Sequence, residues 1–199
     1  MRGLIIRLIY GLMIGVITIL AACAPPPSPF NATEVTGVSY GTELQIADTQ
    51  GKRRSLSDFS GKVTIVFFGF TSCPDVCPTT LMRLGQLRQK LGADGGAVQV
   101  ILVTVDPERD TASRLEAYVK NFDASFLALQ PAPAELESVV KAFHAIAMKV
   151  PTADGTDYTI DHSSTIYVYD RKTRMRLIAQ PDTPIEQLAV DIRRLLADS

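Results

Sequence analysis

This sequence has few thiol and imidazole side chains with which to bind a metal or form a cross-link. Its 199 residues include three cysteines, two histidines and no tryptophan. So few cysteines exclude a small scaffold held together by several disulfides. Charge of one sign is not in excess either, because 20 basic residues stand against 21 acidic ones, which excludes the basic surface typical of nucleic-acid binding. The positions of the few thiols and imidazoles therefore carry most of the functional information.

The chain opens with the features of a secretory signal. Arg2 and Arg7 stand at the start of a short apolar run, which ends in small residues at Leu20-Ala21-Ala22-Cys23. This ending resembles the bacterial lipobox, which implies that Cys23 is acylated and becomes the mature N-terminus. The alternative is an uncleaved membrane anchor, because the stretch from Leu4 to Ala22 is almost long enough to span a bilayer. Both interpretations place the rest of the chain outside the cytoplasm, attached to a bacterial membrane.

These features divide the chain into three predicted regions. Residues 1–22 form the predicted lipoprotein signal peptide, residues 23–40 the lipidated Cys23 and a proline-rich tether, and residues 41–199 one folded domain. The tether prediction rests on the prolines of residues 25–29 and on the absence of apolar periodicity. Removal of residues 1–22 takes away two of the 20 basic residues and none of the 21 acidic ones, so the net charge falls from −1 to −3.

Apolar patterns in the domain alternate between strand and helix spacing. Residues 63–68 are a β-branched and aromatic run typical of a buried strand, and residues 98–105 repeat that profile. Leucines at helical spacing follow in residues 79–91, and Pro184 opens a closing amphipathic helix. This order predicts an α/β layer fold built on parallel strands. Further strands are expected at 43–48, just after the turn at 49–52, and at 145–150, 158–161, 165–169 and 175–179. Further helices are expected after residue 111 and at 134–143.

The two remaining cysteines lie where the central strand ends. Cys73 and Cys77 have three residues between them, and each is followed by a proline. Because proline disfavours a helical conformation in the residue before it, we expect both cysteines on a curled loop, with Cys77 as the N-cap of a helix that begins at Pro78. The free N–H groups and the helix dipole there favour a thiolate, which metal binding and disulfide exchange both need. A structural disulfide is the alternative, although closing so short a loop adds little stability.

His162 is the candidate third member of this site. It precedes the strand expected at 165–169, so it can approach the cysteines only if that strand runs antiparallel to the central one. Two thiolates and one imidazole form a soft ligand set that suits Cu(I), and an added oxygen donor or water would allow Cu(II). Zn²⁺ would need a fourth ligand, for which Asp75 or Asp161 is available, and Asp161 could instead orient the imidazole. His144, at the end of an amphipathic helix, is expected to be a core or surface residue.

A polar segment, Asp106 to Thr111, follows the next strand. Because ligands collect at the carboxyl ends of parallel strands, its side chains are candidates for the same region. Turn and helix-cap chemistry explains Pro107 and Asp110 without a further role, and either Asp110 or Thr111 can cap the helix that follows. Asp106 and Arg109 remain candidates for the surroundings of the metal or for a docking face.

Three segments together resemble the Sco/SenC family of copper chaperones in order and approximate spacing. They are residues 68–78, residues 106–111 and residues 158–170. The similarity covers roughly residues 41–198. It implies a thioredoxin-like fold, in which a central mixed β-sheet is flanked by helices and carries an N-terminal strand extension and a β-hairpin insertion.

The same resemblance implies the site and its use. Copper would be held by Cys73, Cys77 and His162. The protein would help to build the binuclear copper centre of cytochrome c oxidase by giving copper, by reducing the target's cysteines, or both. Its partner would be the copper-bearing subunit of the oxidase or another copper chaperone, and we expect a monomer that binds no nucleic acid.

A thiol-disulfide oxidoreductase that keeps partner cysteines reduced is the alternative function. The sequence disfavours it as the sole function, because such enzymes favour two residues between the cysteines and place a cis-proline where Ser163-Ser164-Thr165 stands. A thiol peroxidase is a weaker third hypothesis, since it would not need His162.

Overall fold

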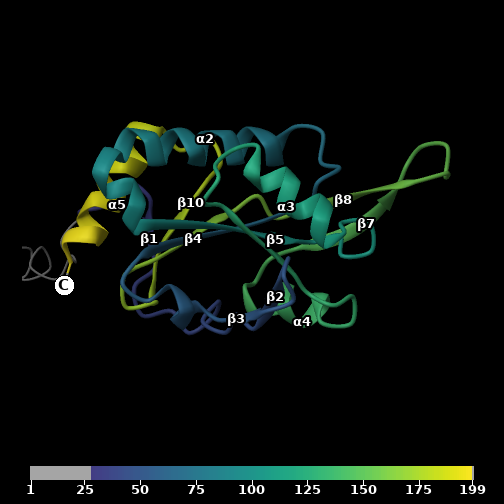
Figure 1. Cartoon of the computed structure of the whole chain (residues 1–199), viewed down its shortest axis with the longest axis horizontal. Coiled ribbons are helices and arrows are strands. Elements are labelled where there is room, and N and C mark those ends of the chain that lie inside the picture. Colours follow the sequence, from purple (N-terminus) through teal and green to yellow (C-terminus); the bar gives the residue numbers. More distant parts are fainter. Residues whose placement is uncertain (1–27, 199) are drawn as a thin grey trace, which may run out of the picture.

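The structure is a computed structural model that describes residues 28–198. The predicted signal peptide, Cys23 and the first part of the tether lie outside the described residues. Within the described part, no helix is both long enough and apolar enough to cross a bilayer. Figure 1 shows a domain with helices on both faces of its sheet and one hairpin that projects beyond the body.

An eight-stranded sheet forms the centre of the domain, in the order β1-β10-β9-β4-β5-β6-β2-β3. β4, β5 and β6 run parallel, and the other neighbouring pairs are antiparallel. The sheet is therefore mixed, as predicted for this fold class. Its strands are β1 (Thr33–Glu34), β2 (Ile46–Asp48), β3 (Arg53–Arg54), β4 (Val63–Gly69), β5 (Val98–Thr104), β6 (Leu127–Gln130), β9 (Ile166–Tyr169) and β10 (Met175–Ala179).

Helices cover both faces of this sheet. α2 and α5 pack against one another on one side, and α4 lies on the other side near β3 (Figure 1). Every residue of β4 and β5 is buried, so these two strands need cover on both faces. The helices are α2 (Val76–Leu91), α3 (Ala112–Lys120), α4 (Leu136–Ala142) and α5 (Ile185–Ala197), with short 3-10 helices at η2 (Leu56–Phe59) and η3 (Gly92–Ala97).

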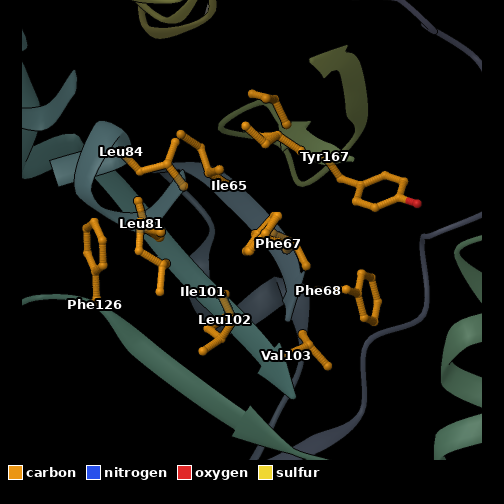
Figure 2. Close-up of a cluster of buried hydrophobic side chains, with 14 of the residues drawn as sticks. Ile65, Phe67, Phe68, Leu81, Leu84, Ile101, Leu102, Val103, Phe126 and Tyr167 are labelled. Atoms are coloured by element: carbon orange, nitrogen blue, oxygen red, sulfur yellow. The ribbon is translucent and has the colours of Figure 1, made fainter. Parts of the chain in front are cut away.

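The core lies between α2 and the central strands. Leu81 and Leu84 of α2 belong to the same buried cluster as Ile65, Phe67 and Leu102 of β4 and β5 (Figure 2). Burial of each such side chain stabilises the fold by about 1.5–3 kcal/mol relative to exposure. This packing also fixes the first turns of α2 against the sheet.

β1 and β6 are absent from the sequence-based prediction. β1 pairs with β10 although it lies in the predicted tether. The backbone N–H groups of Asn31 and Ala32 also donate to the buried carboxylate of Asp191 on α5, at 2.8 to 3.0 Å. The fold therefore begins before residue 41, and the predicted start of the domain is wrong. The reason is that a strand of two residues has no periodicity, and its partners lie near the far end of the chain.

β7 (Ala147–Pro151) and β8 (Tyr158–His162) form a separate two-stranded antiparallel sheet, which is the predicted hairpin insertion. It is the element that projects from the domain in Figure 1. β9 follows it and runs antiparallel to β4, with Ile166 opposite Phe67. This is the direction that His162 needs in order to approach the cysteines, so the condition set by the sequence is met.

Candidate metal centre

The two cysteines lie on either side of the start of α2. Cys73 is in the loop after β4, whereas Cys77 is the second residue of α2, behind Asp75 as the N-cap. The prediction that Cys77 caps the helix from a loop is therefore wrong. Pro78 disfavours but does not prevent a helical conformation at Cys77, and N–H groups in the first turn have no intrahelical acceptor to lose. Cys77 still has an N-terminal position that favours a thiolate.

His162 lies beside both cysteines. Its Nε2 is 3.4 Å from Cys77 Sγ, and the backbone N–H of Cys77 donates to Cys73 Sγ at 3.4 Å. The three candidate ligand atoms lie within 4.8 Å of one another, and the described residues contain no other such group of cysteine, histidine, aspartate and glutamate. The structure thus brings the three predicted residues together, although His162 follows Cys77 by 85 positions.

A hydrogen bond fixes the orientation of the His162 imidazole. Its Nδ1 lies 3.1 Å from the carbonyl oxygen of Ser163, which can only accept a hydrogen bond. Nδ1 therefore carries a hydrogen, and in the neutral ring Nε2, which lies beside the sulfurs, has the lone pair that a metal would use. Asp161, which we considered for this orienting role, has an exposed side chain and is not the hydrogen-bond partner of the ring. The rings of Phe67 and Phe70 meet the imidazole edge to face.

An open cleft of about 420 Å³ leads to this cluster. Phe70, Val76 and Ile160 contribute apolar wall, and the exposed residues Asp75 and Asp161 also line it. Neither carboxylate belongs to the group of three ligand atoms, so neither completes a tetrahedron there. A set of two thiolates and one imidazole fits Cu(I) better than Zn²⁺.

The two thiols differ in their affinity for protons, and both are free in the structure. A hydrogen bond from the Cys77 thiol lowers the pKa of Cys73 from its ordinary value of 9.0 to about 4, although burial opposes the change. The same hydrogen bond raises the pKa of Cys77, and burial and the negative charges of Cys73 and Asp110 add to the rise. The metal-free pair therefore keeps one proton and carries its negative charge on Cys73. A metal ion that binds both sulfurs must displace that last proton.

Gly69, the last residue of β4, leaves room for the sulfur of Cys77. A Cβ at this position would lie 2.9 Å from Cys77 Sγ, 3.1 Å from Phe67 and 3.2 Å from Leu102. Cys77 is completely buried, so its sulfur has no solvent-filled space to move into. A side chain at position 69 would therefore disturb the cluster directly.

Asp110 is a buried residue of this region that the sequence analysis explained by turn and cap chemistry. Its carboxylate accepts hydrogen bonds from the backbone N–H of Thr71 at 3.1 Å, from the Thr71 hydroxyl at 2.5 Å and from the Thr104 hydroxyl at 2.6 Å. Of the two predicted cap candidates, Thr111 is the cap of α3. Asp110 thus joins the start of the cysteine loop to the end of β5. The signal for this role, an acidic residue close behind a buried strand, does not distinguish a cap from such a link.

Asp106 and Arg109 do not belong to the cluster of ligand atoms. They contact the β7–β8 hairpin next to its turn, through Tyr158, a residue to which the sequence analysis gave no role. His144 also lies outside the cluster, and its ring stacks on Tyr40 with the centroids 4.4 Å apart.

A family model with the description SCO1/SenC matches residues 33–197. Among curated relatives, the SCO2-like protein RP587 of Rickettsia prowazekii is 32% identical over 176 residues, which cover 85% of each chain. The mitochondrial SCO1 homolog 1 of Arabidopsis thaliana is 36% identical over 131 residues, which are 65% of this chain. The chain spans only 39% of the length of that plant protein.

Solved structures match as well. The copper-bound structure of Bradyrhizobium japonicum ScoI is 38% identical, with a TM-score of 0.71 over 79% of this chain and 99% of that one. BsSco, a member of the Sco family of cytochrome c oxidase assembly proteins, shares the fold at 23% identity, with a TM-score of 0.65 over 84% and 99% of the two chains. These matches confirm the predicted thioredoxin-like fold. Because the family model covers most of the chain, including Cys73, Cys77 and His162, the protein belongs to the SCO1/SenC family.

Proposed function

We propose that this protein is a copper chaperone that helps to build the binuclear copper centre of cytochrome c oxidase. Cys73, Cys77 and His162 hold the copper as cargo. The observation that carries this proposal is the approach of two sulfurs and one imidazole nitrogen within 4.8 Å, beside an open cleft. These three donors suit Cu(I), and an added oxygen donor or water extends the set to Cu(II).

The relatives support both the cargo and the destination. Bradyrhizobium japonicum ScoI has been solved with copper bound, and BsSco belongs to a family of cytochrome c oxidase assembly proteins. By this likeness, the partner is the copper-bearing subunit of the oxidase or another copper chaperone. The protein acts as a monomer in this proposal.

The proposed location is the extracytoplasmic side of a bacterial membrane. Arg2 and Arg7 before the apolar run support export, and the small residues before Cys23 support attachment of lipid at that cysteine. A lipid anchor keeps the domain close to a membrane-bound target, which raises the effective concentration of each for the other.

Transfer of copper requires that its ligands exchange one after another. The cleft opens one side of the cluster, so a thiolate or imidazole of the partner can approach the metal from there. His162 stands at the end of the two-stranded hairpin and is the least buried of the three residues. We expect His162 to leave the metal first, because local opening costs least where few buried contacts resist it.

Thiol-disulfide exchange is a second candidate function. It is favoured by the lowered pKa of Cys73, which lines the cleft, while Cys77 is fully buried. In this reaction the Cys73 thiolate attacks one sulfur of a partner disulfide and releases the other as a thiolate. Cys77 then gives its proton to the partner's released thiolate and attacks the Cys73 sulfur of the mixed disulfide, so a Cys73–Cys77 disulfide forms and the partner leaves with one thiol and one thiolate.

Titration of the reduced protein with Cu(I) against a competing chelator tests the chaperone function. We expect His162→Ala to weaken copper binding by about 100-fold or more, because loss of even an outer-shell partner of a ligand costs about 10–100-fold. His144→Ala is the matched control, since that ring stacks on Tyr40 outside the cluster, and it should bind copper as the parent protein does.

The same variants separate the two functions. His162→Ala retains both cysteines, so a thiol titration should show that the pair still oxidises and reduces. An unchanged copper affinity in His162→Ala would contradict the chaperone function. A parent protein that binds no copper but reduces a partner disulfide would leave thiol exchange as the function.

A further inference from the structure

The 106–110 loop, which follows β5, holds the first residue of β8 in three ways. The buried carboxylate of Asp106 accepts a hydrogen bond from the Tyr158 hydroxyl at 2.9 Å. Arg109 donates to the same carboxylate at 2.5 Å and to the backbone carbonyl of Tyr158 at 2.8 Å. Its guanidinium carbon also lies 3.7 Å from the centroid of the Tyr158 ring. The hydroxyl, the ring and the backbone of Tyr158 are thus all fixed.

Among the ion pairs at this contact, the one between Arg109 and Asp106 is shielded from solvent and should contribute most to holding Tyr158. The Asp106 side chain has no exposure and that of Arg109 is 23% exposed. Lys149 of β7 lies 4.6 Å from the Tyr158 ring and pairs with Glu108 at 2.6 Å, but both of these side chains are about half exposed. Exposed ion pairs contribute little, so Arg109 and Asp106 should determine where the turn end of the hairpin strands lies.

The same loop also holds the segment that carries the cysteines. Asp110 accepts hydrogen bonds from Thr71, which lies two residues before Cys73. Asp110 therefore joins the 106–110 loop to the cysteine loop. Asp106 and Arg109 join the same loop to β8, the strand that ends in His162. The loop connects the two halves of the candidate copper site.

We infer that Arg109 and Asp106 are positioning residues for copper binding, which hold β8 so that His162 stays within reach of the cysteines. This inference rests on the proposed function. Tyr158 and His162 are the two ends of one five-residue strand, so fixing Tyr158 limits the tilt of that strand. A hairpin of two strands is marginally stable by itself and needs such support.

Replacement of the arginine tests this role. We expect Arg109→Ala to weaken Cu(I) binding by about tenfold, the lower end of the range for outer-shell partners. Arg109→Lys keeps the charge but lacks the fork of donors, so it should recover only part of the affinity. Arg53→Ala is the matched control, because it removes an equal charge from an exposed ion pair with Glu135 and should leave copper binding unchanged.

A double-mutant cycle shows whether Arg109 acts through the imidazole. With His162→Ala already present, Arg109→Ala should cause no further loss of affinity, because the ring whose position it sets is gone. The thiolate-to-copper charge-transfer band of the Arg109→Ala Cu(II) complex should move toward that of His162→Ala. Equal losses in both backgrounds would overturn the inference, since Arg109 would then act on the cysteines or on the fold.

The cycle also distinguishes this inference from the proposed function. If His162→Ala binds copper as the parent does, the proposed function itself fails. If His162→Ala weakens binding but Arg109→Ala does not, only the positioning role fails. Should Arg109→Ala not fold, Tyr158→Phe removes the hydroxyl bond to Asp106 while keeping the ring, and the same cycle then applies with a smaller expected loss; no loss in that variant overturns the role.

Discussion

Substitution of Gly69 tests how tightly β4 packs against the sulfur of Cys77. Alanine at this position adds a carbon that would lie 2.9 Å from Cys77 Sγ, while ordinary contact begins at 3.4 Å. The sulfur would therefore have to retreat by about 0.5 Å, or β4 would have to shift. Phe67 and Leu102 also lie closer to the new carbon than 3.4 Å, and like Cys77 they are completely buried. Gly69 does not have a left-handed backbone, so the effect is steric.

Two measurable effects should result from Gly69→Ala. Overpacking of a well-packed core costs about 1–3 kcal/mol, so we expect the free energy of unfolding to fall by that amount. Metal–ligand distances tolerate deviations of only about 0.2 Å, and displacement of the sulfur by more than this should weaken copper binding on the order of tenfold.

Urea unfolding and Cu(I) titration against a chelator measure the two effects. Gly96→Ala is the matched control, because Gly96 is exposed and no atom lies within 4 Å of the added carbon. If Gly69→Ala unfolds and binds copper as the parent does, the Cys77 sulfur is not confined by β4, and the reasoning about this site is refuted.

The remaining predictions concern proton affinity, a buried carboxylate and the core. Because the hydrogen bond from Cys77 lowers the pKa of Cys73 to about 4, alkylation of the reduced, metal-free protein should vary little between about pH 6 and about pH 8, and Cys77→Ala should slow it at neutral pH; a rate that rises steeply over this range contradicts the prediction. Asp170→Asn should cost about 1–3 kcal/mol of unfolding free energy at neutral pH, because the buried carboxylate accepts hydrogen bonds from the backbone and from Arg174. Burial acts to raise the pKa of Asp170, but these hydrogen bonds outweigh it, so the folded pKa is lowered. The difference in unfolding free energy between parent and variant should therefore be complete above the unfolded pKa of about 3.9 and disappear as the pH falls through the lower folded pKa. Urea unfolding at several pH values measures it, and a difference that does not change with pH would contradict the reasoning. Leu81→Ala, one turn of α2 beyond Cys77, should lower the free energy of unfolding by about 2–5 kcal/mol, and a thermal midpoint equal to that of the parent would show that α2 does not depend on this packing.

Local patterns in the sequence predicted the elements next to the site. The β-branched and aromatic run before Gly69 predicted β4, and the leucine spacing after Pro78 predicted most of α2, because both signals report burial of a local face. The exception is Cys77, for which the conformational preference imposed by Pro78 was overridden in the first turn of α2, where the Cys77 side chain is buried.

The sequence by itself determined which atoms can bind a metal, and only the tertiary structure decided how those atoms are placed. The types and order of Cys73, Cys77 and His162 define a soft ligand set before any fold is known. Their approach depends on the antiparallel pairing of β9 with β4 and on the hold of Arg109 on β8. The identity of a side chain is a local property, whereas strand pairing and its register result from packing between segments far apart in the chain.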